Sequence, residues 1–212
     1  MTGSDGKWRT RAVAWSKDQP FGAEHAELEL AANQMRAKGT AIGSEPVAYR
    51  LDYTLETGPD LVTSRVTVST RGERWGRQIV LERAESGSWA CDVQQHGLEL
   101  DIPAPGGEMS QFDGALDPDL ALSPVFNSMP VLRHRLFEGG AAPELLMVWI
   151  SVPDLALYPS LQRYRLRRTL DDGNQVVLFE GPDPKGGDFV ADLVFDRDGV
   201  VIDYPGIATR IR

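Results

Sequence analysis

The feature of this sequence that most constrains its fold is a turn signal that recurs about every ten residues, between stretches of alternating apolar and polar residues. The clearest pair of stretches covers residues 47–55 and 62–68, with Gly58, Pro59 and Asp60 between them. Alternation with period two is typical of a strand with one buried and one solvated face, and the turn makes this pair an antiparallel hairpin. Strands at this spacing predict a meander, a sandwich or a barrel.

The same pattern continues through most of the chain. We expect further strands at residues 13–15, 24–30, 75–81, 89–93, 98–102, 145–152, 161–170, 176–179, 189–195, 200–204 and 207–211. Residues 95–97 are expected to form a turn, and residues 103–115, which are rich in proline and glycine, a loop. Asp196, Asp198 and Gly199 superficially resemble a calcium-binding loop. The glycine comes too early and no acidic residue closes the loop, so we interpret them as a hairpin turn.

Residues 113–137 interrupt the alternation with signals that begin helices and bend the chain. Asp117 can cap a short helical turn, with Pro118 at the first helical position, where its missing amide hydrogen does no harm. Ser123 and Pro124 repeat this start signal. The stretch therefore predicts a bent insert of short helices.

Pro130 disfavours helical geometry in the residue before it, so we expect the insert to end there and residues 131–136 to leave as a strand. A flat sheet of this many strands would expose long edges. We therefore predict an all-β fold in which a single strongly curved antiparallel sheet, barrel-like or half-barrel-like, wraps around a short helical insert at about 113–130. Residues 1–7 are expected to be a flexible tail, and residues 8–212 a single β-barrel-like domain.

Composition and charge exclude several classes of function. The chain has 212 residues, of which 42% are hydrophobic and 25% charged, and this is typical of a globular protein. A formal net charge of −9 argues against binding to nucleic acid or to an anionic lipid surface. Cys91 is the only cysteine, so the chain forms no internal disulfide, and no stretch approaches the ~20 apolar residues of a membrane span. We expect a cytoplasmic protein with no nucleic-acid partner and no stable membrane insertion.

Several short motifs in the second half of the chain occur together in one known family. They are Leu116-Asp117-Pro118-Asp119-Leu120, Ser123-Pro124, Asn127, Met129-Pro130-Val131-Leu132-Arg133, Val152-Pro153-Asp154-Leu155, Gln162 with Tyr164, and Asp196 through Gly199 and Val201 to Tyr204-Pro205. In these motifs the chain resembles the bacterial putative glycolipid-binding family, once catalogued as a domain of unknown function. The resemblance implies a β architecture similar to lipoprotein-carrier folds, together with lipid or glycolipid binding.

The acidic pair Asp117 and Asp119 has two interpretations. Two carboxylates could act as the acid and base of a glycosidase, or could hold a divalent cation. Helix capping explains both acids and the proline between them, and we favour it. A buried Arg133 or Arg135 would need an acidic partner such as Asp117 or Asp119. We therefore expect Asp117, Asp119 and Arg135 to belong to a structural network that fastens the insert to the sheet.

A candidate ligand-binding set combines polar and aromatic groups from the insert and the strands that follow it. Its members are Asn127, Arg133, His134, Trp149, Gln162 and Tyr164. Gln162 and Tyr164 lie on the same strand face as Leu166, and a few polar groups in an apolar interior are typical of a small-molecule pocket. The same composition fits a protein core whose polar groups are all hydrogen-bonded. For His134 we favour a role as a hydrogen-bonded core residue over a catalytic role.

From these residues we expect a non-enzymatic protein that binds a glycolipid or another hydrophobic small molecule, with no catalytic residue, metal or cofactor. An enzyme acting on a small hydrophobic or sugar substrate, with Asp117, Asp119 or His134 as acid-base groups, is one alternative. A structural or assembly module without a ligand is another. The oligomeric state is open.

Overall fold

The computed structural model describes residues 8–140, 142–183 and 186–211; the expected tail, residues 1–7, lies outside these ranges. The described chain is built mainly from strands. They are β1 (Arg9–Asp18), β2 (Phe21–Leu30), β3 (Met35–Gly43), β4 (Tyr49–Thr57), β5 (Thr63–Gly72), β6 (Trp75–Arg83), β7 (Trp89–Gly97), β8 (Asp117–Leu120), β9 (Leu145–Ile150), β10 (Leu157–Thr169), β11 (Gln175–Pro182), β12 (Asp188–Phe195), β13 (Val201–Tyr204) and β14 (Ala208–Ile211). Helical turns are few and short: η1 (Pro59–Leu61), η2 (Met109–Phe112), η3 (Pro124–Asn127), α1 (Ser128–Arg133) and η4 (Leu136–Glu138).

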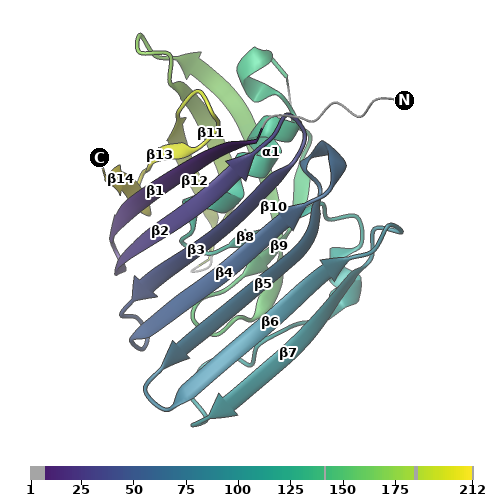
Figure 1. Cartoon of the computed structure of the whole chain (residues 1–212), viewed down its shortest axis with the longest axis vertical. Coiled ribbons are helices and arrows are strands. Elements are labelled where there is room, and N and C mark those ends of the chain that lie inside the picture. Colours follow the sequence, from purple (N-terminus) through teal and green to yellow (C-terminus); the bar gives the residue numbers. More distant parts are fainter. Residues whose placement is uncertain (1–7, 141, 184–185, 212) are drawn as a thin grey trace.

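The strands form one sheet of fourteen strands in the order β7-β6-β5-β4-β3-β2-β1-β14-β13-β12-β11-β10-β9-β8. Neighbouring strands are antiparallel except for β8 and β9, which are parallel. The sheet curls so that β1–β7 form a front layer and β8–β12 lie behind it (Figure 1). It stays open, with β7 and β8 as its edges. The predicted all-β fold with one strongly curved sheet is confirmed.

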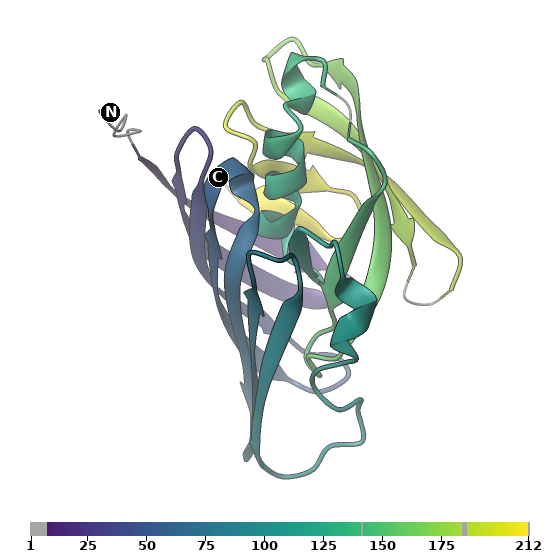
Figure 2. The same cartoon turned by 90° about the vertical axis from the view of Figure 1, so that its right-hand side faces the viewer.

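The insert lies between the two layers of the curled sheet, as the side view shows (Figure 2). Its residues from Pro124 to Val131 are all buried. The ring of Phe126 packs edge-on against Tyr53 of β4, with 5.4 Å between ring centroids. On the other side, Gly199 of the β12–β13 turn has a φ of +80°, which favours glycine, and a Cβ atom there would lie 2.5 Å from the side chain of Leu132 of α1. The insert therefore fills the space around which the sheet curls.

Several local predictions within residues 113–137 are wrong. Asp117 caps no helix, because Asp117–Leu120 is the strand β8, whose pairing with β9 outweighs the local Asp-Pro signal. The expected strand at 131–136 is largely helix. Pro130 is the third residue of α1, in the first turn, where amide hydrogens have no partner within the helix. Helical geometry therefore continues through it.

Two further predictions fail near the β7 edge. Residues 95–97 form no turn, because β7 continues to Gly97, and residues 98–102 form no strand. Beyond Cys91 every residue of β7 is solvent-exposed, including Val93 on the same face as Trp89, so alternation does not reflect burial at this edge. The expected loop at 103–115 contains the short helix η2, which buries Phe112.

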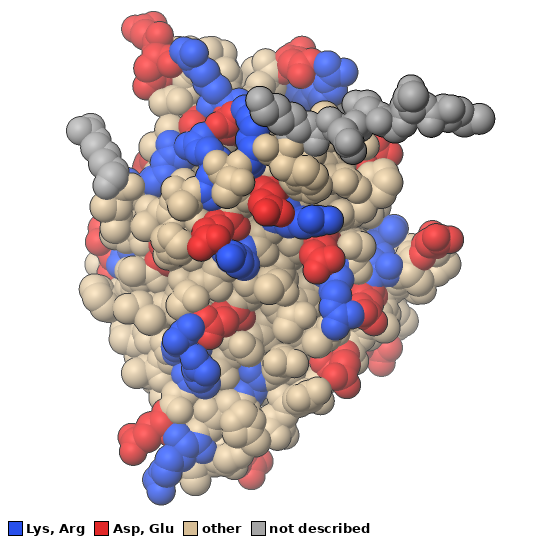
Figure 3. Space-filling view, in the orientation of Figure 1, with Lys and Arg blue, Asp and Glu red and all other residues tan. Residues whose placement is uncertain are grey.

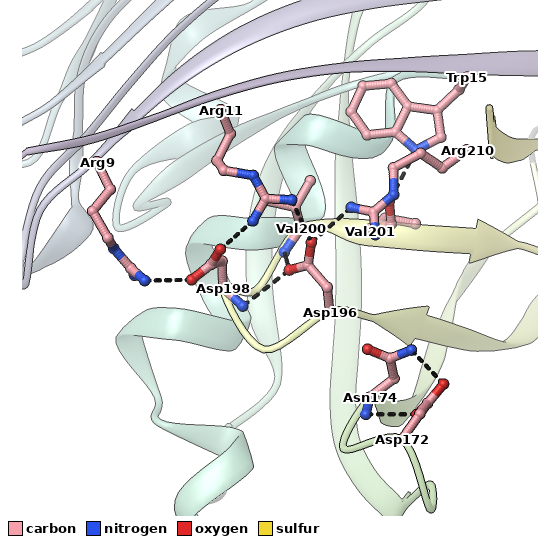
Figure 4. Close-up of polar contacts among 10 residues, drawn as sticks. All are labelled: Arg9, Arg11, Trp15, Asp172, Asn174, Asp196, Asp198, Val200, Val201 and Arg210. Carbon is pink, nitrogen blue, oxygen red and sulfur yellow. Dashed lines mark hydrogen bonds and ion pairs between the residues drawn. The ribbon is translucent and has the colours of Figure 1, made fainter. Parts of the chain in front are cut away.

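Polar contacts fasten the β12–β13 turn to the first and last strands (Figure 4). Asp196 accepts hydrogen bonds from the backbone amides of Asp198 and Val200, both at 3.0 Å. Its carboxylate also pairs with Arg11 at 3.2 Å and with Arg210 at 2.7 Å. The carboxylate of Asp198 pairs with Arg9 and Arg11, so both aspartates act as turn and ion-pair residues. A calcium loop is not formed.

The outer face of the front layer carries acidic and basic side chains that lie close to one another (Figure 3). Cross-strand pairs such as Lys38 with Glu27, at 3.0 Å, account for part of this pattern. Charges of both signs are interspersed on this face. No helix in the described ranges has the length and apolar character needed to cross a bilayer.

Candidate functional site

A cleft of about 530 Å³ opens between the insert and the back layer of the sheet. Its wall includes residues 119–123 and Asn127 from the insert region, together with side chains from β9 to β12 and the segment after β13. Five aromatic side chains line it: Trp149, Tyr158, Phe179, Phe189 and Tyr204. Volumes of 300–1,000 Å³ with aromatic walls and a few polar groups are typical of small-molecule sites.

The aromatic side chains of the wall come from strands that alternate in and out. Trp149 and Tyr158 face each other across the β9–β10 pair, with ring centroids 5.8 Å apart. The rings of Phe179, Phe189 and Tyr204 pack against one another, with centroids 6.0 to 6.1 Å apart. The cleft is therefore bounded by rings on two sides.

A chain of hydrogen bonds joins four polar side chains at the inner end of the cleft. Nε2 of Gln162 donates to Oδ2 of Asp119 at 2.7 Å. The hydroxyl of Tyr164 donates to Oε1 of Gln162 at 3.0 Å, and Nδ2 of Asn127 donates to the Tyr164 oxygen at 2.9 Å. We call Asp119, Gln162, Tyr164 and Asn127 the polar relay. Asp119, Gln162 and Asn127 line the cleft, and Tyr164 lies behind them.

Asp119 is the acidic end of the polar relay. Burial raises the pKa of this carboxyl to about 6; the hydrogen bond from Gln162 lowers it and the charge of Asp117 raises it. Residues two apart on a strand share a face, which explains why Asp117 acts on Asp119. Burial also raises the pKa of Tyr164 well above its ordinary value, so the phenol keeps its proton.

Asp117 is sealed away from the cleft by a bidentate ion pair. The Arg133 guanidinium donates to both carboxylate oxygens, at 2.6 and 2.7 Å, and the Thr63 hydroxyl donates at 3.0 Å. The same guanidinium donates to the backbone oxygens of Asp60 and Leu61. Asp117 is fully buried, so this group connects β8, α1 and the β4–β5 turn.

The structure places the other predicted site residues in different surroundings. His134 follows α1 and is not among the described residues of the cleft wall; its Nε2 atom is buried and has no partner within the described chain. Arg133 is also outside the wall. Arg135 is exposed and pairs with Glu138, so it does not join Asp117 or Asp119 in a network. Asn127, Trp149 and Gln162 line the cleft, as described above.

A buried polar group that the sequence prediction missed lies beside the cleft. Glu24 of β2 is 2% exposed and pairs with Lys17 at 2.9 Å. Its Oε1 atom accepts hydrogen bonds from Tyr53 at 2.9 Å and from Ser123 at 2.6 Å. The alternation of residues 24–30 places Glu24 on the same strand face as the apolar Ala26, and this was the signal in the sequence that Glu24 is buried.

These features define the class of protein: an open, curled β-sheet that encloses a short helical insert and a cleft with aromatic walls and a polar inner end. The chain belongs to the family described as Putative glycolipid-binding, whose model matches residues 12–210. It is also similar to a DUF1089 family protein from Pseudomonas aeruginosa, known from a crystal structure. The two share 26% sequence identity over 100% of this chain and 99% of that one, with a TM-score of 0.62. No curated protein matches this chain.

Proposed function

We propose that this protein binds a glycolipid-like amphiphile in the cleft, with the apolar chain among the aromatic side chains and the head group at the polar relay. The observation that carries the proposal is the composition of the cleft wall, which joins five aromatic residues to a buried chain of polar side chains. The family description agrees with it.

The apolar part of such a ligand supplies most of the binding free energy. Each buried CH₂ group contributes about 0.8 kcal/mol, so a ten-carbon chain supplies about 8 kcal/mol before the cost of ordering the ligand. The volume of the cleft, about 530 Å³, lies within the range of sites for ligands of this size. Polar groups at the inner end then fix the orientation of the head.

The binding function is better supported than the alternative of an acid-base enzyme. Asp117 is held by Arg133 and Thr63, and His134 lies outside the described cleft wall. Asp119 is therefore the one member of the three acid-base candidates that lines the cleft. A glycosidase needs two groups to donate and accept protons across a bound sugar. Asp154 also lines the cleft, but both of its carboxylate oxygens are bonded within its own turn, so a non-enzymatic role is part of the proposal.

A cytoplasmic location completes the proposal. The single cysteine, Cys91, is free, and unpaired thiols are ordinary in reducing compartments.

Native mass spectrometry of the purified protein tests the proposal directly. We expect a bound lipid that co-purifies, and a mass shift when decyl glucoside is added. The variant Ala121→Trp fills the cleft wall and should weaken binding at least about tenfold, while Ala90→Trp, on the exposed face of β7, should bind as the wild type does. A clean protein mass, unchanged by decyl glucoside, would contradict the proposal.

A further inference from the structure

The polar relay has only one consistent direction when Asp119 is ionised. An ionised carboxylate accepts hydrogen bonds and donates none, so Gln162 must present its Nε2 atom to Asp119. Oε1 of Gln162 then faces Tyr164 and must accept the phenol proton. The Tyr164 oxygen is left to accept from Nδ2 of Asn127. The charge of one residue thereby fixes the orientation of two amides and a hydroxyl.

Two acceptor atoms remain unpaired once this direction is set. Oδ1 of Asn127 is buried and has no hydrogen-bond partner within the described chain, although Asn127 is only 1% exposed. Oδ1 of Asp119 also receives no hydrogen bond from a described residue, since the Gln162 bond goes to Oδ2, but it is not one of the described polar atoms that are buried without a partner. Asp119 lines the cleft, so a ligand that brings a donor can form a charge-assisted hydrogen bond with this oxygen.

From this geometry we infer that Asp119, acting through the polar relay, makes the cleft select amphiphiles whose head group donates hydrogen bonds and reject those with an anionic head. The inference rests on the proposed function and names the chemistry of the head group. A hydroxyl or an ammonium group fits equally, because both supply a donor to the carboxylate of Asp119.

The charges around the cleft support this selectivity. Asp119 and Asp154 line it, and no lysine, arginine or histidine is found among its described lining residues. Both carboxylate oxygens of Asp154 are already used within its turn, by Ser151 and by the Ala156 amide. An anionic head would meet an uncompensated carboxylate at Asp119. The remaining donors in the wall, such as the hydroxyl of Ser160, are neutral and offset little of that repulsion.

The variant Asp119→Asn separates this role from a purely structural one. An asparagine at position 119 can donate to Oε1 of a Gln162 amide that has turned over, so the relay can run in the opposite direction. Tyr164 then donates to Oδ1 of Asn127, and Nδ2 of Asn127 takes the place where the unpaired Oδ1 atom was. Selectivity should then weaken while the cleft keeps its size. Asp171→Asn, in the exposed β10–β11 turn, removes the same charge far from the relay and serves as the matched control.

Calorimetric titration at pH 7.5 with four ten-carbon probes below their micelle concentrations tests the inference. The probes are decyl glucoside, decylammonium, decyltrimethylammonium and decanoate. We expect decyl glucoside and decylammonium to bind at least about tenfold more tightly than decanoate, which corresponds to one unpaired buried acceptor. Decyltrimethylammonium carries charge but no donor, and it should bind more weakly than decylammonium.

The variants and the ranking of probes give distinct outcomes. Asp119→Asn should reduce the preference over decanoate to less than about threefold, and Asp171→Asn should retain it. Thermal melting shows whether each variant is folded. If Asp119→Asn does not fold, the order in which the wild type binds the four probes still tests the inference. Equal or tighter binding of decanoate to the wild type would overturn this inference and leave the proposed function standing. Absence of binding by all four probes would overturn both.

Discussion

Gly39 of β3 lies directly across from Tyr53 of β4, and a Cβ atom on Gly39 would come within 2.4 Å of the tyrosine ring. Gly43 and Tyr49 repeat the arrangement on the same two strands, at 2.5 Å. The rings of β4 therefore cover the bare backbone of β3. Tyr53 cannot move away easily, because it is 3% exposed and its hydroxyl binds Glu24.

The first prediction concerns this close approach. Gly39→Ala should lower the free energy of unfolding by about 1–3 kcal/mol, since overpacking outweighs the usual gain from replacing glycine in a strand. Gly58→Ala is the control: its φ is −83° and the nearest atom to a new Cβ is 3.9 Å away. Urea denaturation measures both. Equal stabilities for the two variants would show that the ring yields without cost.

The second prediction concerns the ion pair that holds the insert to β8. Arg133→Met leaves the buried carboxylate of Asp117 without its partner, so we expect a loss of about 3–5 kcal/mol in the free energy of unfolding. Arg135→Met removes the same kind of side chain two residues later, from an exposed pair with Glu138, and should change it by less than about 1 kcal/mol. If the two variants unfold at the same urea concentration, the Arg133 pair contributes no more than a surface contact.

The third prediction concerns the contact between the insert and β2. Ser123→Ala removes the 2.6 Å hydrogen bond to the buried Glu24 carboxylate, and we expect a loss of about 1–3 kcal/mol. In Ser86→Ala the lost hydroxyl is one that contacts Ser88 on the surface, so this variant should stay within about 0.5 kcal/mol of the wild type. Chemical denaturation distinguishes them, and an unchanged Ser123 variant would mean that water replaces the serine.

The fourth prediction follows from the pKa of Asp119, which burial raises from 3.8 to about 6. Between about pH 4 and pH 6 the native protein binds a proton at Asp119 that the unfolded chain has released, so this group stabilises the fold at low pH. The contribution is lost as the pH rises through 6. Asp117, Tyr164 and Tyr204 face the same carboxyl; the tyrosines stay neutral in this range because burial raises their pKa values well above 10.

Urea unfolding of the wild type and Asp119→Asn across pH 4 to pH 7 measures this effect. The difference in free energy of unfolding, wild type minus variant, should fall as the pH rises. Groups common to both proteins cancel in this difference, including Asp52, whose pKa is lowered by its hydrogen bonds from Arg50 and Thr40. A difference that is flat or rises with pH would contradict a raised pKa at Asp119.

Most strands were predictable from sequence where large apolar residues alternate with polar ones, although the alternating residues 98–102 form no strand. Strand β3 was not predicted, because its inward positions include Gly39 and Gly43, which show no apolar alternation by themselves. Their small size makes sense only beside Tyr53 and Tyr49 on the next strand. Strand β3 can therefore be recognised only together with the tyrosines of β4 that cover its glycines.

The candidate site was predictable only in part, for a related reason. Period two placed Gln162 and Tyr164 on one face of β10, and both are buried and hydrogen-bonded to each other. Their link to Asp119 joins positions 43 residues apart, and local sequence carries no signal for such a pairing. The Asp-Pro-Asp motif resembled a helix start, although β8 is defined by its parallel neighbour β9.

The seam between β1 and β14 has a consequence for how the chain folds. Within β1–β7, and again within β8–β14, each strand pairs with the next strand along the chain, so each half can assemble from neighbours as it leaves the ribosome. In the middle of the sheet the halves are joined by the pairing of β1 with β14, in which Ala14, Trp15 and Ser16 lie opposite Ile211, Arg210 and Thr209. The sheet therefore becomes continuous only when β14 pairs with β1, and removing that strand would interrupt the sheet at its centre while leaving both outer edges intact.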